Sequence, residues 1–181
     1  MQCPSCSSSS LKLTKLEDQL PARECLNCHG ILLDLLTYRA WAEKQPHPTK
    51  SHTTQCEVED NGKALICPKC SKLMLKFRIT GEKTNTIDVC TNCDDAWLDK
   101  GEWTLLSELS LQKKLNRIFT DPWQRQIRKD IATKSLQQRN KALLGEEDYT
   151  KLLQIKDWIA QHEKKHDLLR ILTRELQADL F

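Results

Sequence analysis

Eight of the nine cysteines in this 181-residue sequence fall into four C-x-x-C pairs. The pairs make two sets of nearly equal spacing: Cys3, Cys6, Cys25 and Cys28, then Cys67, Cys70, Cys90 and Cys93. Four thiolates complete the tetrahedral shell of a structural zinc ion, and two C-x-x-C turns brought together by a hairpin supply them. The spacing therefore predicts two Zn²⁺ ions, each held by one set of four cysteines.

Other uses of paired cysteines stay open at this point: redox dithiols, rubredoxin-like iron sites and disulfides. A redox dithiol normally stands in a βαβ context, which the sequence does not indicate. Disulfides belong to exported proteins, and the N-terminus MQCPSC has neither a basic nor an apolar signal region. Cys56, the ninth cysteine, lies in a polar stretch beside acidic residues and is interpreted as a spare thiol.

The two cysteine sets belong to an internal repeat whose copies lie 64 to 65 positions apart. Both copies open with Cys-Pro, carry Asn before the last cysteine, and continue into an apolar-Leu-Asp tripeptide. The first repeat, residues 1–44, includes a short helix after its last cysteine, and the second repeat, residues 65–110, includes the start of the next helix. The polar linker 45–64 between them predicts two modules that move independently.

The stretches CPSC…CLNCHGILLD and CPKC…CTNCDDAWLDKGEW resemble the transcription factor IIB-type zinc ribbons of many bacterial proteins. The second repeat matches their W-L-D-x-G-E signature from Trp97 to Glu102, but has Asp95 where Gly is usual. The first repeat keeps Gly30 and Asp34 and has Leu32 in place of Trp. The resemblance covers residues 1–110 and implies small zinc ribbons with short β-hairpins, and nucleic-acid or protein binding. His29, beside Cys28, is not expected to be a ligand because four thiolates already complete the shell.

The helical tail, residues 111–181, is predicted to be all-α, because from about residue 99 the apolar period fits about three helices. Residues 111–145 carry nine Lys or Arg against two Asp, although the whole chain has a formal charge of only +3, or −1 with two bound zinc ions. One helix face gathers four cations opposite apolar residues: Arg125, Arg128, Lys129 and Arg139. This face is either a contact for nucleic acid or an acidic partner, or a solvated helix surface. The acidic residues Asp94, Asp95, Asp99 and Glu102 favour a protein contact on the second repeat.

A second chemical motif, HEKKH from His162 to His166, matches the H-E-x-x-H of zinc hydrolases. In that motif two histidines on one helix turn bind the metal and the glutamate, here Glu163, is the general base. However, both histidines continue a heptad pattern that predicts one long last helix with a coiled-coil seam: Leu152, Ile155, Ile159, His162, His166, Leu169, Thr173, Leu176 and Leu180. Only fifteen residues follow His166 to supply a third ligand. An incidental match is favoured over a metal site between chains and over a metallopeptidase.

The leading hypothesis is a non-enzymatic, zinc-binding adaptor that contacts protein, nucleic acid or both through the basic helix. The alternative is a zinc-dependent hydrolase using residues 162–166. The seam of the last helix also predicts a partner surface, including a homodimer. No apolar run reaches the ~18 residues that span a bilayer, so a cytoplasmic protein without membrane contact is expected.

Overall fold

A computed structural model describes residues 1–8, 11–44 and 62–178. Most of the predicted linker 45–64, with Cys56, lies outside these residues. The chain divides into two compact units, Met1–Ile131 and Ala132–Phe181. Among the described residues, no helix has the length and apolar character needed to span a membrane.

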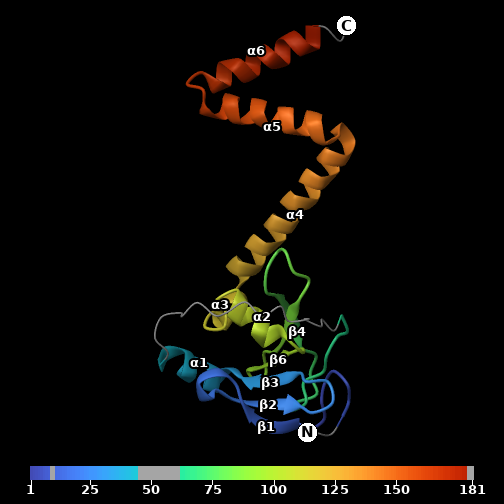
Figure 1. Ribbon diagram of the computed structural model, residues 1–181, viewed down its shortest axis with the longest axis vertical. Helices are drawn as coiled ribbons and strands as arrows, with labels where there is room; N and C mark the ends of the chain where they lie inside the picture. The colour runs from blue at the N-terminus through green and yellow to red at the C-terminus, as the bar shows by residue number, and fades with distance from the viewer. Residues whose placement is uncertain (9–10, 45–61, 179–181) are drawn as a thin grey trace. The chain divides into compact units, whose positions relative to one another are not determined.

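Both repeats contribute to one antiparallel sheet in the first unit (Figure 1). The strands are β1 (Leu11–Lys15), β2 (Pro21–Cys25), β3 (Ile31–Asp34), β4 (Leu75–Arg78), β5 (Thr86–Cys90) and β6 (Asp95–Leu98). Their order is β1-β2-β3-β6-β5-β4, with the short 3₁₀ helix η1 (Glu17–Gln19) between β1 and β2. The prediction of two independently moving modules is therefore wrong. Each three-stranded half would leave the backbone groups of its third strand unpaired, and the β3–β6 pairing satisfies both edges at once.

The β3–β6 register relates the two repeats by a local two-fold axis. Leu32 pairs with Trp97, which lies 65 positions later and is its counterpart in the second repeat. On either side, Asp34 pairs with Asp95, and Ile31 pairs with Leu98. A residue that faces its own counterpart across an antiparallel pair lies on the symmetry axis. The sheet is thus a pseudo-symmetric dimer of the two repeats within one chain.

Three helices pack with the sheet around the core of this unit: α1 (Leu35–Lys44), α2 (Glu102–Glu108) and α3 (Leu115–Ile118). Tyr38, Trp41 and Trp103 form a chain of ring contacts, with centroids 5.9 and 6.0 Å apart. The long helix α4 (Asp121–Leu144) begins in the same unit. There Ile127 is buried, and the indole N–H of Trp123 donates to the carbonyl of Ile79 at 3.3 Å.

The two repeats enter their helices differently. In the first repeat, the Asp34 carboxylate accepts the Thr37 N–H at 2.7 Å, so α1 begins directly after β3. In the second repeat a turn intervenes, Gly101 adopts φ 84°, and α2 begins at Glu102. The positive φ explains the glycine of the W-L-D-x-G-E signature.

The part of the chain after residue 110 contains more helices than predicted. Residues 99–181 hold five described helices instead of about three, because α2 and α3 are separate helices, and so are α5 (Glu146–Gln161) and α6 (Lys165–Ala178). The predicted long last helix breaks at His162, whose ψ of 137° is extended. The resulting hairpin lets the apolar residues of α5 and α6 face each other, which one continuous helix could not do. The described residues thus form six α-helices and a six-stranded sheet.

Candidate metal centres

All four C-x-x-C pairs adopt the same turn. In each, the N–H of the residue after the second cysteine donates to the carbonyl of the first cysteine: Ser7 to Cys3, His29 to Cys25, Ser71 to Cys67 and Asp94 to Cys90, at 2.8 to 2.9 Å. These four donor residues all have φ between 56° and 59°. Left-handed backbone costs a non-glycine residue about 1–2 kcal/mol. The same costly conformation occurs at four equivalent places, which indicates that these turns serve to position the thiols.

The turns bring the predicted sulfur atoms together in two groups. Within each group, all four sulfurs lie within 4.8 Å of one another. Individual Sγ···Sγ distances are 3.5 Å for Cys3 and Cys28 and 3.6 Å for Cys6 and Cys25. A tetrahedral zinc with Zn–S bonds of about 2.3 Å separates its sulfurs by roughly 3.8 Å. Each group can therefore hold one zinc ion, as predicted, and the sulfurs are too far apart for the disulfide alternative.

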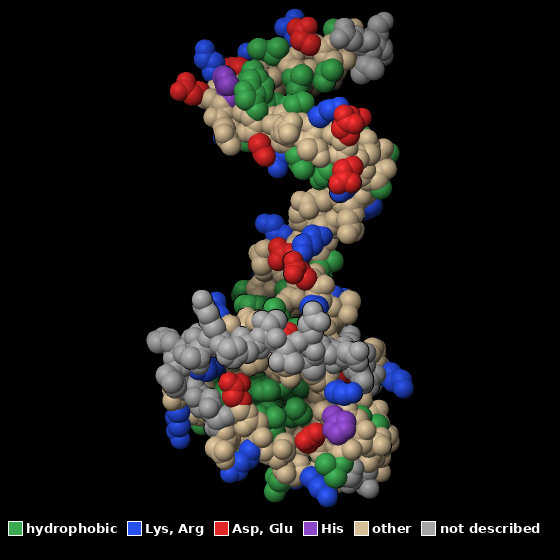
Figure 2. Space-filling model, in the orientation of Figure 1, with side chains coloured by type: hydrophobic (Ala, Val, Ile, Leu, Met, Phe, Trp, Pro, Cys, Tyr) green, Lys and Arg blue, Asp and Glu red, His purple; other side chains and the backbone are tan. Residues whose placement is uncertain are grey.

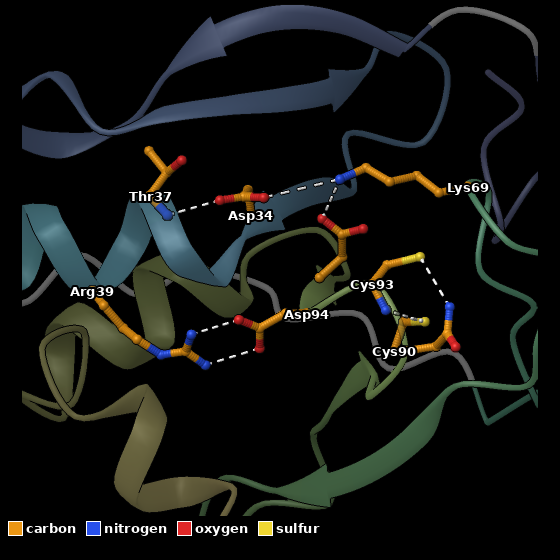
Figure 3. Close-up of polar contacts among 9 residues, drawn as sticks. Asp34, Thr37, Arg39, Lys69, Cys90, Cys93 and Asp94 are labelled. Atoms are coloured by element: carbon orange, nitrogen blue, oxygen red, sulfur yellow. Dashed lines mark hydrogen bonds and ion pairs between the residues drawn. The ribbon is translucent and has the colours of Figure 1, made fainter.

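Backbone and side-chain donors surround the thiols. The N–H of Cys93 lies 3.4 Å from the sulfur of Cys90, and the amide of Asn92 lies 3.9 Å from the sulfur of Cys93 (Figure 3). In the first group, the N–H of Cys6 lies 3.5 Å from the sulfur of Cys3. N–H groups aimed at sulfur favour the thiolate over the thiol. The turns therefore supply hydrogen bonds that would stabilise metal-bound thiolates.

Without a metal, the thiols of each group have very different proton affinities. A hydrogen bond from the Asn27 side chain lowers the pKa of Cys6 to about 6, and the Lys72 backbone N–H lowers that of Cys70 to about 7. Burial raises the pKa of Cys3 to about 11 and that of Cys67 to about 12. Cys6 and Cys70 therefore ionise more readily than Cys3 and Cys67, whose thiols would lose their protons to the charge of a bound metal.

The signature residues after the second cysteine group build a turn and do not add ligands. The Trp97 indole N–H donates to the Asp99 carboxylate at 2.9 Å, and the Asp99 N–H donates to the Glu102 carboxylate at 2.9 Å. Asp99 and Glu102 are buried, and so is Asp95. The prediction of a protein contact is therefore wrong for Asp95, Asp99 and Glu102, whereas the fourth acid, Asp94, has a side chain that is 46% exposed. The carboxyl groups of the three buried acids make hydrogen bonds inside the fold.

Two ion pairs that the sequence did not predict join the repeats (Figure 3). Arg39 on α1 donates to both oxygens of Asp94, at 2.5 and 2.8 Å. Lys69, inside the third C-x-x-C pair, lies 2.6 Å from Asp95 and 4.0 Å from Asp34. No local pattern signals these contacts, because Arg39 and Asp94 are 55 positions apart.

The remaining candidate ligands lie outside the two groups. The ring of His29 contacts the Glu24 carboxylate at 3.0 Å, and His29 is not part of the first sulfur group. His162 follows the end of α5 and accepts the Lys164 N–H at 3.0 Å, whereas His166 lies on α6. The two histidines are thus not on one helix turn, which the hydrolase motif requires. Within the described ranges, the two cysteine groups are the only clusters suited to a metal.

The predicted basic residues are all exposed: Arg125, Arg128, Lys129 and Arg139. The first three belong to the first unit and Arg139 to the second. Arg125 makes one loose contact with Asp121 at 3.9 Å, between two highly exposed side chains. Such pairs contribute little, so the charge of this face is available to an external anion.

Comparison with known proteins supports a zinc-ribbon assignment for the residues that contain the first cysteine group. A family model for a transcription factor zinc-finger, of the transcription factor IIB zinc-ribbon type, matches residues 2–44. The chain has no match among curated proteins or among solved structures.

Proposed function

We propose that this protein is a non-enzymatic zinc-binding adaptor of transcription-related complexes. In this proposal, residues 1–44 and 65–110 are two zinc ribbons of one type, joined by the linker 45–64 and followed by the helical tail 111–181. The observation that carries the proposal is the pair of preorganised four-cysteine groups in one continuous sheet. A zinc with four thiolate ligands has no open position for water or substrate, so its role is structural.

The basic face of α4 is the proposed contact for nucleic acid. Its cations Arg125, Arg128 and Lys129 are exposed, while Ile127 on the other side of the helix is buried in the first unit. A cationic face on a helix that packs on the sheet suits the phosphate backbone. The helical tail beyond α4 is the proposed contact for protein.

Titration of labelled duplex DNA, single-stranded DNA and RNA with the zinc-loaded full chain tests the nucleic-acid part. Between about 50 and about 200 mM salt, affinity should fall steeply. Replacing Arg125, Arg128 and Lys129 by Ala should lower the slope of log K against log salt by about 2.7, roughly 0.9 for each lost phosphate contact. The matched control replaces Lys12, Lys15 and Lys44, which are exposed in the first repeat. Absence of binding at low salt, or equal loss in both triple variants, would refute the nucleic-acid contact.

Native mass spectrometry tests the structural role of the metal. Two zinc ions per chain are expected, with none lost on His162→Ala. A third zinc that disappears in His162→Ala, together with peptidase activity that disappears in Glu163→Gln, would overturn the non-enzymatic assignment.

A further inference from the structure

The hairpin of α5 and α6 exposes many large apolar side chains. Seven of them are between 43% and 58% exposed: Leu152, Ile155, Trp158, Leu169, Ile171, Leu172 and Leu176. In contrast, Ile159 is the one buried residue of the two helices as far as they are described. Figure 2 shows hydrophobic side chains gathered over this hairpin. Exposed apolar side chains that are gathered in one patch mark a site of contact with a partner.

Four of these side chains, Leu152, Ile155, Leu169 and Leu172, line a groove between the two helices with a volume of about 380 Å³. On α5 its walls are Leu152, Ile155 and Ile159, and on α6 they are Leu169 and Leu172. The α5 spacing of three and four residues is that of a helix-packing seam. Two packed helices bury apolar side chains only where they touch each other. The apolar side chains beside that contact are buried only when further helices cover them, as in a four-helix bundle.

The charges around the groove are arranged for self-pairing. Its only charged lining residues, among those the structure describes, are Lys156 and Lys165. The same hairpin carries acids at the start of α5, where the side chains of Glu146, Glu147 and Asp148 are 80%, 85% and 70% exposed. Their ion pairs with Lys141 and Lys151 are solvent-exposed and therefore weak. In an antiparallel two-fold pairing, the acidic start of one α5 lies beside the lysine-bearing part of the other.

We propose that the occupant of this groove is a second copy of the chain, so that α5 and α6 of two copies form an antiparallel four-helix bundle. One copy supplies both the apolar face and the acidic flank that the groove of the other requires. The inference deepens the proposed function and rests on it, since it identifies the protein that the helical tail binds. A dimer would present two sheets and two basic faces to one nucleic acid, and would gain affinity by multivalency.

The first test is the mass of the zinc-loaded full chain by light scattering and sedimentation over a wide concentration range. Wild type should be a dimer that dissociates on dilution. Ile155→Glu and Leu172→Glu should each weaken dimerisation at least roughly tenfold, which is about 1.4 kcal/mol. Leu143→Glu is the matched control, because Leu143 on α4 is 83% exposed and lies outside the groove. Circular dichroism checks that the variants keep their helices.

The second test reverses charges. One variant changes Glu146, Glu147 and Asp148 to Lys, and the other changes Lys156 and Lys165 to Glu. Each alone should be monomeric, because its groove meets like charges, and an equimolar mixture should recover the dimer. Monomeric wild type at all concentrations, or a dimer insensitive to Ile155→Glu, would refute the proposal. A monomer that keeps two zinc ions and binds nucleic acid would refute the dimer alone, whereas a dimer without nucleic-acid binding would refute the proposed function alone.

Discussion

The two repeats share their cysteine turns and differ where their third strands meet. In the second repeat, Trp97 lies against Gly30, and a Cβ atom at Gly30 would stand 2.2 Å from the Trp97 ring. The local two-fold axis relates this pair to Asp95 and Leu32 on the other side of the sheet centre. There a leucine replaces the tryptophan, and a residue with a side chain replaces the glycine. The two departures from the ribbon signature, Leu32 for Trp and Asp95 for Gly, thus compensate each other, because the smaller leucine leaves room for the aspartate side chain.

The replacement of Trp by Leu32 and of Gly by Asp95 makes this side of the sheet centre more polar than the side of Trp97 and Gly30. Leu32 and Asp95 line a hollow of about 120 Å³ together with Asp34 and Lys69. Asp95 is buried, which raises its pKa, and its carboxylate binds the Lys69 ammonium at 2.6 Å. On the Trp97 side, the same space is filled by apolar ring atoms. Duplicated modules can therefore diverge at their shared axis, provided that a large residue and its small partner change together.

Loss of one zinc site should unfold both repeats, which is the largest effect expected. A structural zinc contributes about 10–16 kcal/mol, more than a small domain can lose, and β3 and β6 form one sheet. Cys25→Ser should therefore remove hydrogen-exchange protection from β6 as well as β3, and chelation of both metals should unfold residues 1–110. Cys56→Ser, outside the eight ligands, is the control and should keep two zinc ions. Unchanged protection of β4 to β6 in Cys25→Ser would show that the repeats fold independently.

Gly30→Ala should cost about 3 kcal/mol or more, since the new methyl group overlaps the Trp97 ring. The matched change on the other side, Asp95→Gly, removes a side chain that has room and should create no overlap. Gly62→Ala is the control, because a Cβ atom at Gly62 would meet no described atom within 4 Å. Denaturant unfolding of the zinc-loaded proteins measures all three. Equal stability of Gly30→Ala and Gly62→Ala would contradict the asymmetric packing.

The sequence predicted the features that depend on short spacing. The cysteine sets were found because C-x-x-C turns are local, and both groups of sulfurs assemble as expected. The β3–β6 pairing was missed because nothing in either strand identifies its partner. The break at His162 was missed because the three-and-four spacing of apolar residues is the same in one long helix and in two helices that face each other. Arg39 and Lys69 gave no signal, since their partners are distant in sequence or belong to the other repeat.

The helices that follow the two third strands also differ, and this difference gives the smallest predicted effect. Tyr38 on α1 is the counterpart of Trp103, 65 positions later, and it is fully buried. Its hydroxyl accepts the Leu115 N–H at 3.1 Å, and burial raises its pKa from 10.0 to about 12.

Because the pKa of Tyr38 is higher in the folded than in the unfolded chain, its contribution to stability is complete below pH 10 and is lost as pH rises towards 12. The loss is about 1.4 kcal/mol per pH unit in that window. Tyr38→Phe should be less stable than wild type at pH 8, because the Leu115 N–H loses its acceptor, and the difference should shrink by about 1.4 kcal/mol at pH 11. Tyr149→Phe on α5 is the control for general alkaline effects. A stability difference between wild type and Tyr38→Phe that stays constant from pH 8 to pH 11 would show that the Tyr38 hydroxyl ionises as easily in the folded protein as in the unfolded chain.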